Sequence, residues 1–111
     1  MVHEMKLNVD PFEKIAKGTK TIEMRLYDDK RRKVQVGDII EFTNRETKEK
    51  VNVVVVNLHV FPSFKELYKA FNQVSLGYEE WEIALHTDME QYYLTPDIEK
   101  YGVVGIEIQL V

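Results

Sequence analysis

The feature that most limits the fold is the β-branched segment from Val51 to His59. Its centre, Val53–Val56, is the longest uninterrupted apolar run of the chain. β-branched side chains lose rotamer freedom in a helix and pack well on a pleated surface. A continuous apolar run of this length predicts a strand that is buried on both of its faces. The chain is therefore expected to be organised around a sheet.

Alternating apolar and polar residues predict further strands at both ends of the chain and between them. Within Thr21–Tyr27, a period of two turns Ile22, Met24 and Leu26 toward one face and the polar residues toward the other. A polar hairpin loop is expected over Asn44–Lys50. The predicted strands are Met5–Val9, Thr21–Tyr27, the short pieces at Val34–Val36 and Ile39–Phe42, Val51–His59, and Val103–Val111.

Four helices are expected between these strands. Asp10 followed by Pro11 is typical of a helix start, with Asp10 as the cap, and Gly18 predicts where that helix ends. Ser63 and Glu66 form a capping-box pattern that opens a helix reaching about Phe71. The two remaining helices are predicted over Tyr78–Leu85 and from Thr95-Pro96 to Gly102.

The order of these elements predicts an α+β fold, with a small β-barrel or strongly curved sheet and short helices inserted in it and flanking it. Closing the sheet would remove its free edges. With 111 residues, we expect one domain over residues 1–111. There is no cysteine, which excludes disulfides and thiolate metal sites. The first residues lack a signal-peptide pattern and no apolar run could span a bilayer, so a cytoplasmic location is expected.

Charge is unevenly distributed along the chain. The formal net charge is −4, which argues against a strongly basic nucleic-acid binder. Basic residues nevertheless outnumber acidic ones between residues 14 and 33, whereas acidic residues dominate between 66 and 111. Two solvated faces of opposite charge would explain this pattern; a local patch that contacts an RNA backbone is the alternative. The candidates for such contacts are Lys17, Lys30, Arg31, Arg32 and Lys33.

The segment Gly18–Arg25, with the sequence GTKTIEMR, resembles the Gly-x-Lys-Thr-x-Glu-x-Arg signature of the ASCH family, the activating-signal-cointegrator homology domains. Other features in the same order as in stand-alone prokaryotic members support the resemblance, which covers essentially the whole chain. They are Asp10-Pro11-Phe12, Val36-Gly37-Asp38-Ile39-Ile40, Ser63-Phe64 with Glu66-Leu67, and Tyr101–Ile106.

The resemblance implies a PUA-like β-barrel that binds RNA or a modified nucleotide in a cleft lined by the signature strand. In such a cleft Lys20 and Arg25 would meet a phosphate or a base edge, and Glu23 would accept a base amino group or orient Arg25. An aromatic ring such as Tyr27 would stack on a base. The ligand-binding candidates are Lys20, Thr21, Glu23, Arg25, Tyr27 and Ser63, the last because helix starts attract anions. Without the resemblance, Glu23 and Arg25 would be interpreted as a charge pair on the protein surface.

One branch of the family deacetylates N(4)-acetylcytidine, and the resemblance therefore raises the question of catalysis. Lys20 matches that branch's lysine, but Glu23 stands where its threonine nucleophile would be, and a carboxylate needs different chemistry. A later glutamate would be Glu79, Glu80 or Glu82. Lys20 and Glu23 are the catalytic candidates for an amidohydrolase-like or nuclease-like reaction, with Glu23 as general base. Binding without catalysis is the preferred interpretation.

No pattern predicts a cofactor or a metal site. The chain has no phosphate-binding glycine loop or dinucleotide fingerprint, and its histidines, His3, His59 and His86, are far apart in the sequence. Tyr92 and Tyr93 suit core packing better than a stacking wall. Tyr78, Trp81 and Leu85 fit one face of the predicted helix. A third functional hypothesis is a protein-interaction domain that uses the acidic C-terminal half.

Overall fold

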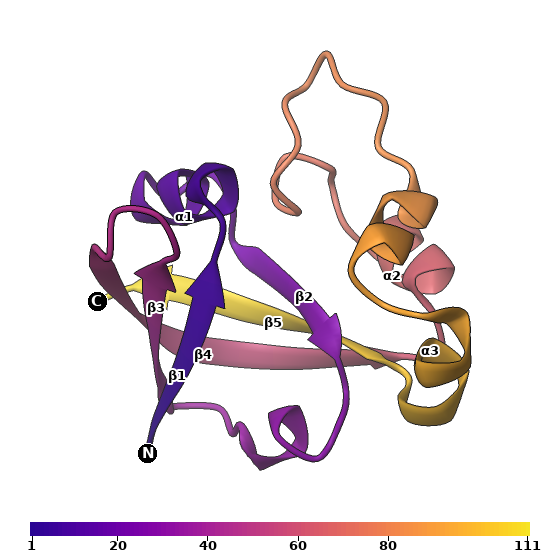
Figure 1. Ribbon diagram of the computed structural model, residues 1–111, viewed down its shortest axis with the longest axis horizontal. Helices are drawn as coiled ribbons and strands as arrows, with labels where there is room; N and C mark the ends of the chain where they lie inside the picture. The colour runs from indigo at the N-terminus through magenta and orange to yellow at the C-terminus, as the bar shows by residue number, and fades with distance from the viewer.

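The computed structural model describes every residue from Met1 to Val111 and places five strands in one sheet with short helices inserted between them (Figure 1). None of the helices has the length and apolar composition that a membrane crossing needs. The strands are β1 (Val2–Leu7), β2 (Ile22–Leu26), β3 (Ile39–Asn44), β4 (Lys50–Phe61) and β5 (Val103–Leu110). The α-helices are α1 (Val9–Ala16), α2 (Phe64–Ala70) and α3 (Thr95–Tyr101), and the 3-10 helices are η1 (Arg31–Lys33) and η2 (His86–Gln91).

The strand order in the sheet is β1-β3-β4-β5-β2. β1 and β3 run parallel, and all other neighbours are antiparallel. β1 and β2 are the two edges, and the sheet curls so far that Arg25 on β2 donates from Nη2 to the carbonyl oxygen of Lys6 on β1 at 2.9 Å. The predicted α+β class with a strongly curved sheet is confirmed. It takes the form of a half-barrel that is not closed by backbone pairing between β1 and β2.

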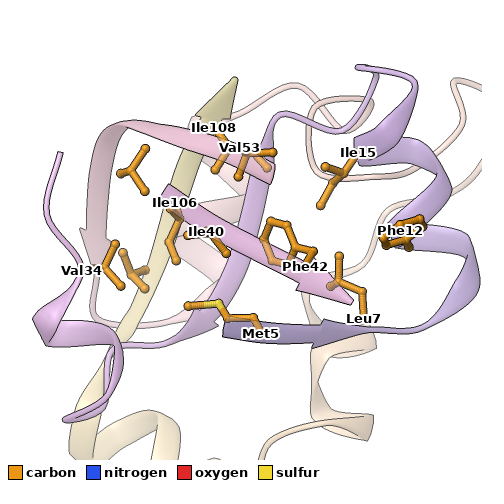
Figure 2. Close-up of a cluster of buried hydrophobic side chains, with 12 residues drawn as sticks. Met5, Leu7, Phe12, Ile15, Val34, Ile40, Phe42, Val53, Ile106 and Ile108 are labelled. Atoms are coloured by element: carbon orange, nitrogen blue, oxygen red, sulfur yellow. The ribbon is translucent and has the colours of Figure 1, made fainter. Parts of the chain in front are cut away.

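The inside of the curl holds the larger of two hydrophobic clusters. Side chains from β1, α1, β3, β4 and β5 point toward one another there, with Phe42 and Ile40 fully buried at its centre (Figure 2). They come from alternate positions of each strand, because successive residues of a strand face opposite sides. Burial of this apolar surface is the main force that holds the curl together.

The prediction that β4 is buried on both faces was wrong. Val53 and Val55 are buried, but Val54 is only partly covered and Val56 is exposed. A register shift lies between Val55 and Asn57 in the pairing with β5, which makes Val56 part of a bulge. Only Val53 and Val55 of the apolar run face the core, because Val54 lies on the other side of the strand and Val56 lies in the bulge.

β5 is the strand that lies between the two hydrophobic clusters. Val104, Ile106 and Ile108 belong to the first cluster, whereas Val103 belongs to the second. The second cluster lies under α2 and includes Ile22, Met24 and Leu26 of β2, as the alternation in that strand predicted. β2 is thereby pinned by its apolar face, which fixes the direction of its opposite, polar face.

The segment between α2 and η2 differs most from prediction. Tyr78–Leu85 forms no helix and projects away from the sheet as an irregular excursion (Figure 1). Gln73 Nε2 donates to the carbonyl oxygens of Glu79 and Glu82, each at 2.8 Å, and Glu82 Oε1 accepts from the Glu79 amide at 2.7 Å. These side-chain bonds take the place of helical backbone bonds. Trp81, predicted on an amphipathic face, is exposed.

Several element boundaries also differ. No strand forms at Val34–Val36, which directly follows η1. Only the next residues, Gly37 and Asp38, form backbone hydrogen bonds to β4, both with Val55. Val9 begins α1 rather than ending β1, so Asn8 and not Asp10 is the N-cap residue. Ser63 is the N-cap of α2, but its hydroxyl bonds the Glu66 carboxylate instead of a helix amide. α1 and α3 end before Gly18 and Gly102, as predicted.

Candidate functional site

A cavity of about 510 Å³ lies between the edge of the half-barrel and the segment that follows α2. One wall is formed by the end of β1, by α1 and by the polar face of β2. The other wall is formed by α2, the turn at Leu76 and Gly77, and η2 with the residues after it. Three of the predicted site residues, Lys20, Glu23 and Arg25, line this cavity together.

These three residues form a buried charge cluster with Glu23 at its centre. Glu23 Oε2 accepts from Arg25 Nε at 2.8 Å and lies 2.7 Å from Arg25 Nη2. Glu23 Oε1 lies 3.4 Å from Lys20 Nζ. The three side chains are only 5–11% exposed, because β2 turns its polar face into the cavity wall and not toward open solvent. The spacing in the motif thus gives one anion held between two cations.

The charges in this cluster set each other's protonation. Although burial opposes ionisation, the positive charges of Arg25 and Lys20 hold the pKa of Glu23 below its ordinary value. Burial lowers the pKa of Lys20, and the Glu23 carboxylate offsets part of that effect. Glu23 is therefore an ionised carboxylate whose two oxygens are both occupied, and it suits holding cations better than accepting a proton from a substrate.

Backbone contacts fix the two cations from outside the cluster. Lys20 Nζ donates to the carbonyl oxygen of Leu76 at 2.8 Å, and Arg25 Nη2 donates to that of Lys6. Gly77 packs directly on Lys20, so that a Cβ atom there would lie 3.1 Å from Lys20 Cδ. On Arg25, Nε and Nη2 have partners within the chain, which leaves Nη1 for an incoming acceptor.

Lys14 tethers the excursion to α1. Its Nζ donates to the carbonyl oxygen of Gly77 at 2.7 Å and lies 3.2 Å from Asp10 and 3.7 Å from Glu79. The side chain is 10% exposed. Lys14 is one of the basic residues that outnumber acidic ones between residues 14 and 33, but its charge is paired within the chain. It holds the two walls of the cavity at their common base.

The far wall of the cavity is aromatic, and Asp88 is hydrogen-bonded to it. Tyr68 and Tyr78 share a hydrogen bond between their hydroxyls at 2.8 Å, and Tyr78 donates to Asp88 Oδ2 at 2.7 Å. Burial, together with these bonds, raises the pKa of Tyr78. Tyr93 stacks on Phe64, with ring centroids 5.9 Å apart, whereas Tyr92 is more than half exposed. Both line the cavity; core packing describes Tyr93, which packs against the second hydrophobic cluster, but not the exposed Tyr92.

The other predicted ligand-binding residues lie outside the cavity. The backbone of Thr21 bonds to Ser75 and Ile108, and its side chain does not line the wall. Tyr27 packs against the first hydrophobic cluster, and the guanidinium of Arg32 covers its ring at 4.3 Å. Ser63 lies at the start of α2 beside Glu66. None of these three side chains contacts the Lys20–Glu23–Arg25 cluster.

The residues predicted to contact an RNA backbone also differ in whether they line the cavity. Arg31 lines the cavity and Lys30 lies beside it in a neighbouring hollow, whereas Lys17, Arg32 and Lys33 line neither. Of the three later glutamates, Glu82 alone lines the cavity.

Two basic residues at the cavity rim, Lys6 and Arg45, were missed by sequence reasoning. Lys6 follows the alternation of β1, but nothing in the local sequence shows that β1 ends beside β2.

The remaining titratable clusters do not resemble metal sites. His3 Nε2 lies 2.8 Å from Asp38 and His59 Nε2 lies 2.9 Å from Glu107. The structure holds no group of three or more histidine, aspartate or glutamate side chains arranged for a metal ion.

Comparison with known proteins gives one family and several solved structures. The family model of the ASCH domain matches residues 5–111. The crystal structure of a hypothetical protein, PH0355, is 35% identical over 100% of both chains, with a TM-score of 0.84. The solution structure of the protein PF0455 from Pyrococcus furiosus is 31% identical over 100% of this chain and 98% of that one, with a TM-score of 0.72. A mutant of ZmASCH from Zymomonas mobilis shares the fold at 12% identity, with a TM-score of 0.70 over 97% of this chain and 67% of that one. No curated protein matches the chain.

Proposed function

The chain belongs to the ASCH domain family, and from that premise we propose that it binds RNA or a modified nucleotide in the cavity lined by Lys20, Glu23 and Arg25. Members of the family are generally taken to bind RNA. The observation that carries the proposal is the meeting of a fixed cation cluster and exposed aromatic surface in one cavity. Its volume of about 510 Å³ lies within the range of about 300–1,000 Å³ for small-molecule sites.

The charge cluster supplies the polar half of the recognition. Glu23 holds the Arg25 guanidinium in one orientation. The free Nη1 can therefore donate to a ligand without a further loss of side-chain freedom on binding. An arginine fixed in this way suits two acceptors in a plane, as in a phosphate or the edge of a base. Lys20 adds a buried positive charge to the lining of the cavity, and charge interactions are stronger at a buried site than in open solvent.

The aromatic wall supplies the apolar half. Unstacked bases of single-stranded RNA bind on aromatic rings, and their edges are then free for hydrogen bonds. Tyr92 is exposed and lines the cavity, so its ring is available to a base. Asp88, which Tyr78 orients through the 2.7 Å hydrogen bond, offers an acceptor for an amino group of the base.

Binding of a labelled single-stranded RNA of about eight nucleotides, followed by fluorescence anisotropy, tests this proposal. Tyr92→Ala should weaken the affinity by about 1–3 kcal/mol, the usual contribution of one stacked base. Trp81→Ala is the matched control, because Trp81 is an exposed aromatic residue of the same region that does not line the cavity. Equal effects of the two substitutions, or no binding by the unaltered protein, would contradict the proposal.

A hydrolase acting on a nucleoside or RNA is a second candidate, favoured by one observation. Lys20 is a buried lysine with a lowered pKa inside the cavity, and perturbed lysines of this kind concentrate at active sites. Against it, Glu23 occupies the position of the threonine nucleophile and has both oxygens engaged. Release of acetate from N(4)-acetylcytidine, or cleavage of the RNA, that disappears in Lys20→Ala would establish this activity. An intact substrate after long incubation would exclude it for these ligands.

A further inference from the structure

A second hollow, of about 620 Å³, opens on the outer side of β1 and β3. We call it the basic groove. Its lining contains seven lysine or arginine side chains, two glutamates and a single hydrophobic residue, Met5. The seven come from four parts of the chain that only the fold brings together: β1, the end of β2, the region of η1, and the hairpin between β3 and β4. They are Lys6, Arg25, Lys30, Arg31, Arg45, Lys48 and Lys50.

The basic groove and the cavity adjoin one another. Both are lined by Lys6, Arg25, Arg31 and Arg45, so every residue that the two hollows have in common is a cation. Arg25 contacts Glu23 on the cavity side and the backbone of β1 on the other. A ligand that leaves the cavity at this junction therefore passes between positive charges.

Much of this positive charge is not neutralised within the molecule. Arg25 and Arg31 pair with Glu23 and Asp28, and Lys50 lies 3.1 Å from Glu41. Lys6, Lys30 and Arg45 form no ion pair within the chain, and their side chains are exposed. In addition, Nε of Arg31 is buried at the junction without an acceptor. The groove thus has an excess of free cations, unlike the cluster inside the cavity, where both cations are paired with Glu23.

The hairpin that carries two of these cations is held in a defined shape. Asn44 is fully buried, and its Oδ1 accepts from the amides of Glu46 and Thr47 at 3.0 and 3.3 Å. Such an asparagine-centred turn fixes the path of the loop backbone. Arg45 and Lys48 are therefore presented from a rigid support, which lowers the entropic cost of binding an anion between them.

From these observations, and resting on the proposed function, we propose that the ligand is a strand of single-stranded RNA rather than a free nucleotide. One base occupies the cavity, and the phosphates of neighbouring nucleotides lie along the basic groove. Two adjoining hollows, one with aromatic rings and one with free cations, match the two parts of an unstacked strand, whose bases splay away from its charged backbone. A double helix keeps its bases stacked and cannot fill the cavity in this way.

The test compares a mononucleotide with a pentanucleotide that contains it, each titrated by calorimetry at several salt concentrations. The groove variant is Lys30→Glu with Lys48→Glu, because both residues line the groove but not the cavity. The control is Lys65→Glu with Lys69→Glu, which changes the net charge equally on exposed positions of α2 that line neither hollow.

We expect the pentanucleotide to bind the unaltered protein at least roughly tenfold more tightly than the mononucleotide. In the groove variant this advantage should disappear, and the salt dependence of pentanucleotide binding should fall by about 1.4, or about 0.7 for each lost phosphate contact. The control should keep the advantage. Equal weakening by both variants, or a pentanucleotide that binds no better than the mononucleotide, would overturn the inference while the cavity proposal stands. Failure of both ligands to bind the unaltered protein would overturn both.

Discussion

The cavity and the basic groove contain the same kinds of charged residue in opposite environments. In the cavity, the Glu23 pairs lie between side chains that are 5–11% exposed. In the groove, Lys50 and Glu41 form a pair of similar length, 3.1 Å, but their side chains are 59% and 25% exposed. Charges removed from water are costly unless they are paired, whereas exposed charges are screened and largely independent.

Under the proposed function, this difference would assign different tasks to the cavity and to the groove. The buried cluster is expected to contribute to the stability of the fold, because each of its charges would be costly to bury without its partner. The groove is expected to add long-range attraction without adding stability. The cavity would then decide which ligand fits, and the groove would decide how strongly a polyanion is drawn to it.

The largest expected effect comes from removing the central anion of the cavity. Glu23→Gln leaves Lys20 and Arg25 buried without their carboxylate, and we expect the free energy of unfolding to fall by about 3–5 kcal/mol. Urea denaturation followed by circular dichroism measures this change. The matched variant in the groove, Glu41→Gln, should cost less than about 1 kcal/mol. Similar losses for the two variants would contradict the distinction between the regions.

A smaller effect is expected from filling the space beside Lys20. Gly77 has a φ of +107°, and an added Cβ would lie 3.1 Å from Lys20 Cδ and 3.3 Å from its Nζ. Gly77→Ala should lose about 1–3 kcal/mol of stability through backbone strain and should also weaken RNA binding by displacing Lys20. Gly37→Ala isolates the strain, because Gly37 has a φ of +94° with nothing within 4 Å of the added atom. Unchanged RNA binding by Gly77→Ala would show that Lys20 does not need its present position.

The pH dependence of stability gives a third test. The pKa of Glu23 is lowered from its ordinary value of 4.5, so the folded state binds fewer protons there than the unfolded state. The resulting stabilisation is complete above pH 4.5 and is lost as the pH falls through the folded pKa. One proton contributes a slope of at most about 1.4 kcal/mol per pH unit. Denaturation in acid should show a shallower slope for Glu23→Gln than for the unaltered protein, and parallel slopes would rule out Glu23 as the titrating group.

The smallest effect on stability is expected in the groove. Lys30→Ala removes an exposed side chain without an ion pair, and it should change the free energy of unfolding by less than about 0.5 kcal/mol. The same substitution should lower the salt dependence of RNA binding by about 0.7. A clear loss of stability would mean that Lys30 supports the fold instead of facing the ligand.

The sequence was informative wherever local periodicity decided the structure. The alternation in Thr21–Tyr27 correctly predicted which face of β2 is apolar, and it placed Glu23 and Arg25 together on the opposite, polar face. The same pattern could not show that the polar face is also buried. That burial depends on the segment after α2, whose Leu76 and Gly77 cover Lys20.

Contacts between residues that are distant in the sequence could not be predicted from local sequence patterns. Lys6 and Arg45 reach the cavity because β1 pairs in parallel with β3 and ends beside β2, and no short motif encodes that arrangement. Tyr27 is a predicted ligand-binding residue that the structure places outside the cavity. Its position on the polar side of the motif favoured a ligand contact, but the strand ends at Leu26, and the Tyr27 ring packs under Arg32.

RNA binding in the cavity is tested most directly by a backbone amide NMR titration with a short single-stranded RNA that carries one N(4)-acetylcytidine. We expect saturable shifts over Lys20–Arg25 and Tyr92–Tyr93, joined by shifts at Lys30–Arg31 and Arg45–Lys48 where the strand leaves the cavity. The acetate signal in the same sample reports any hydrolysis. Absent shifts, or shifts that scatter over the surface and vanish at modest salt, would contradict RNA binding in the cavity.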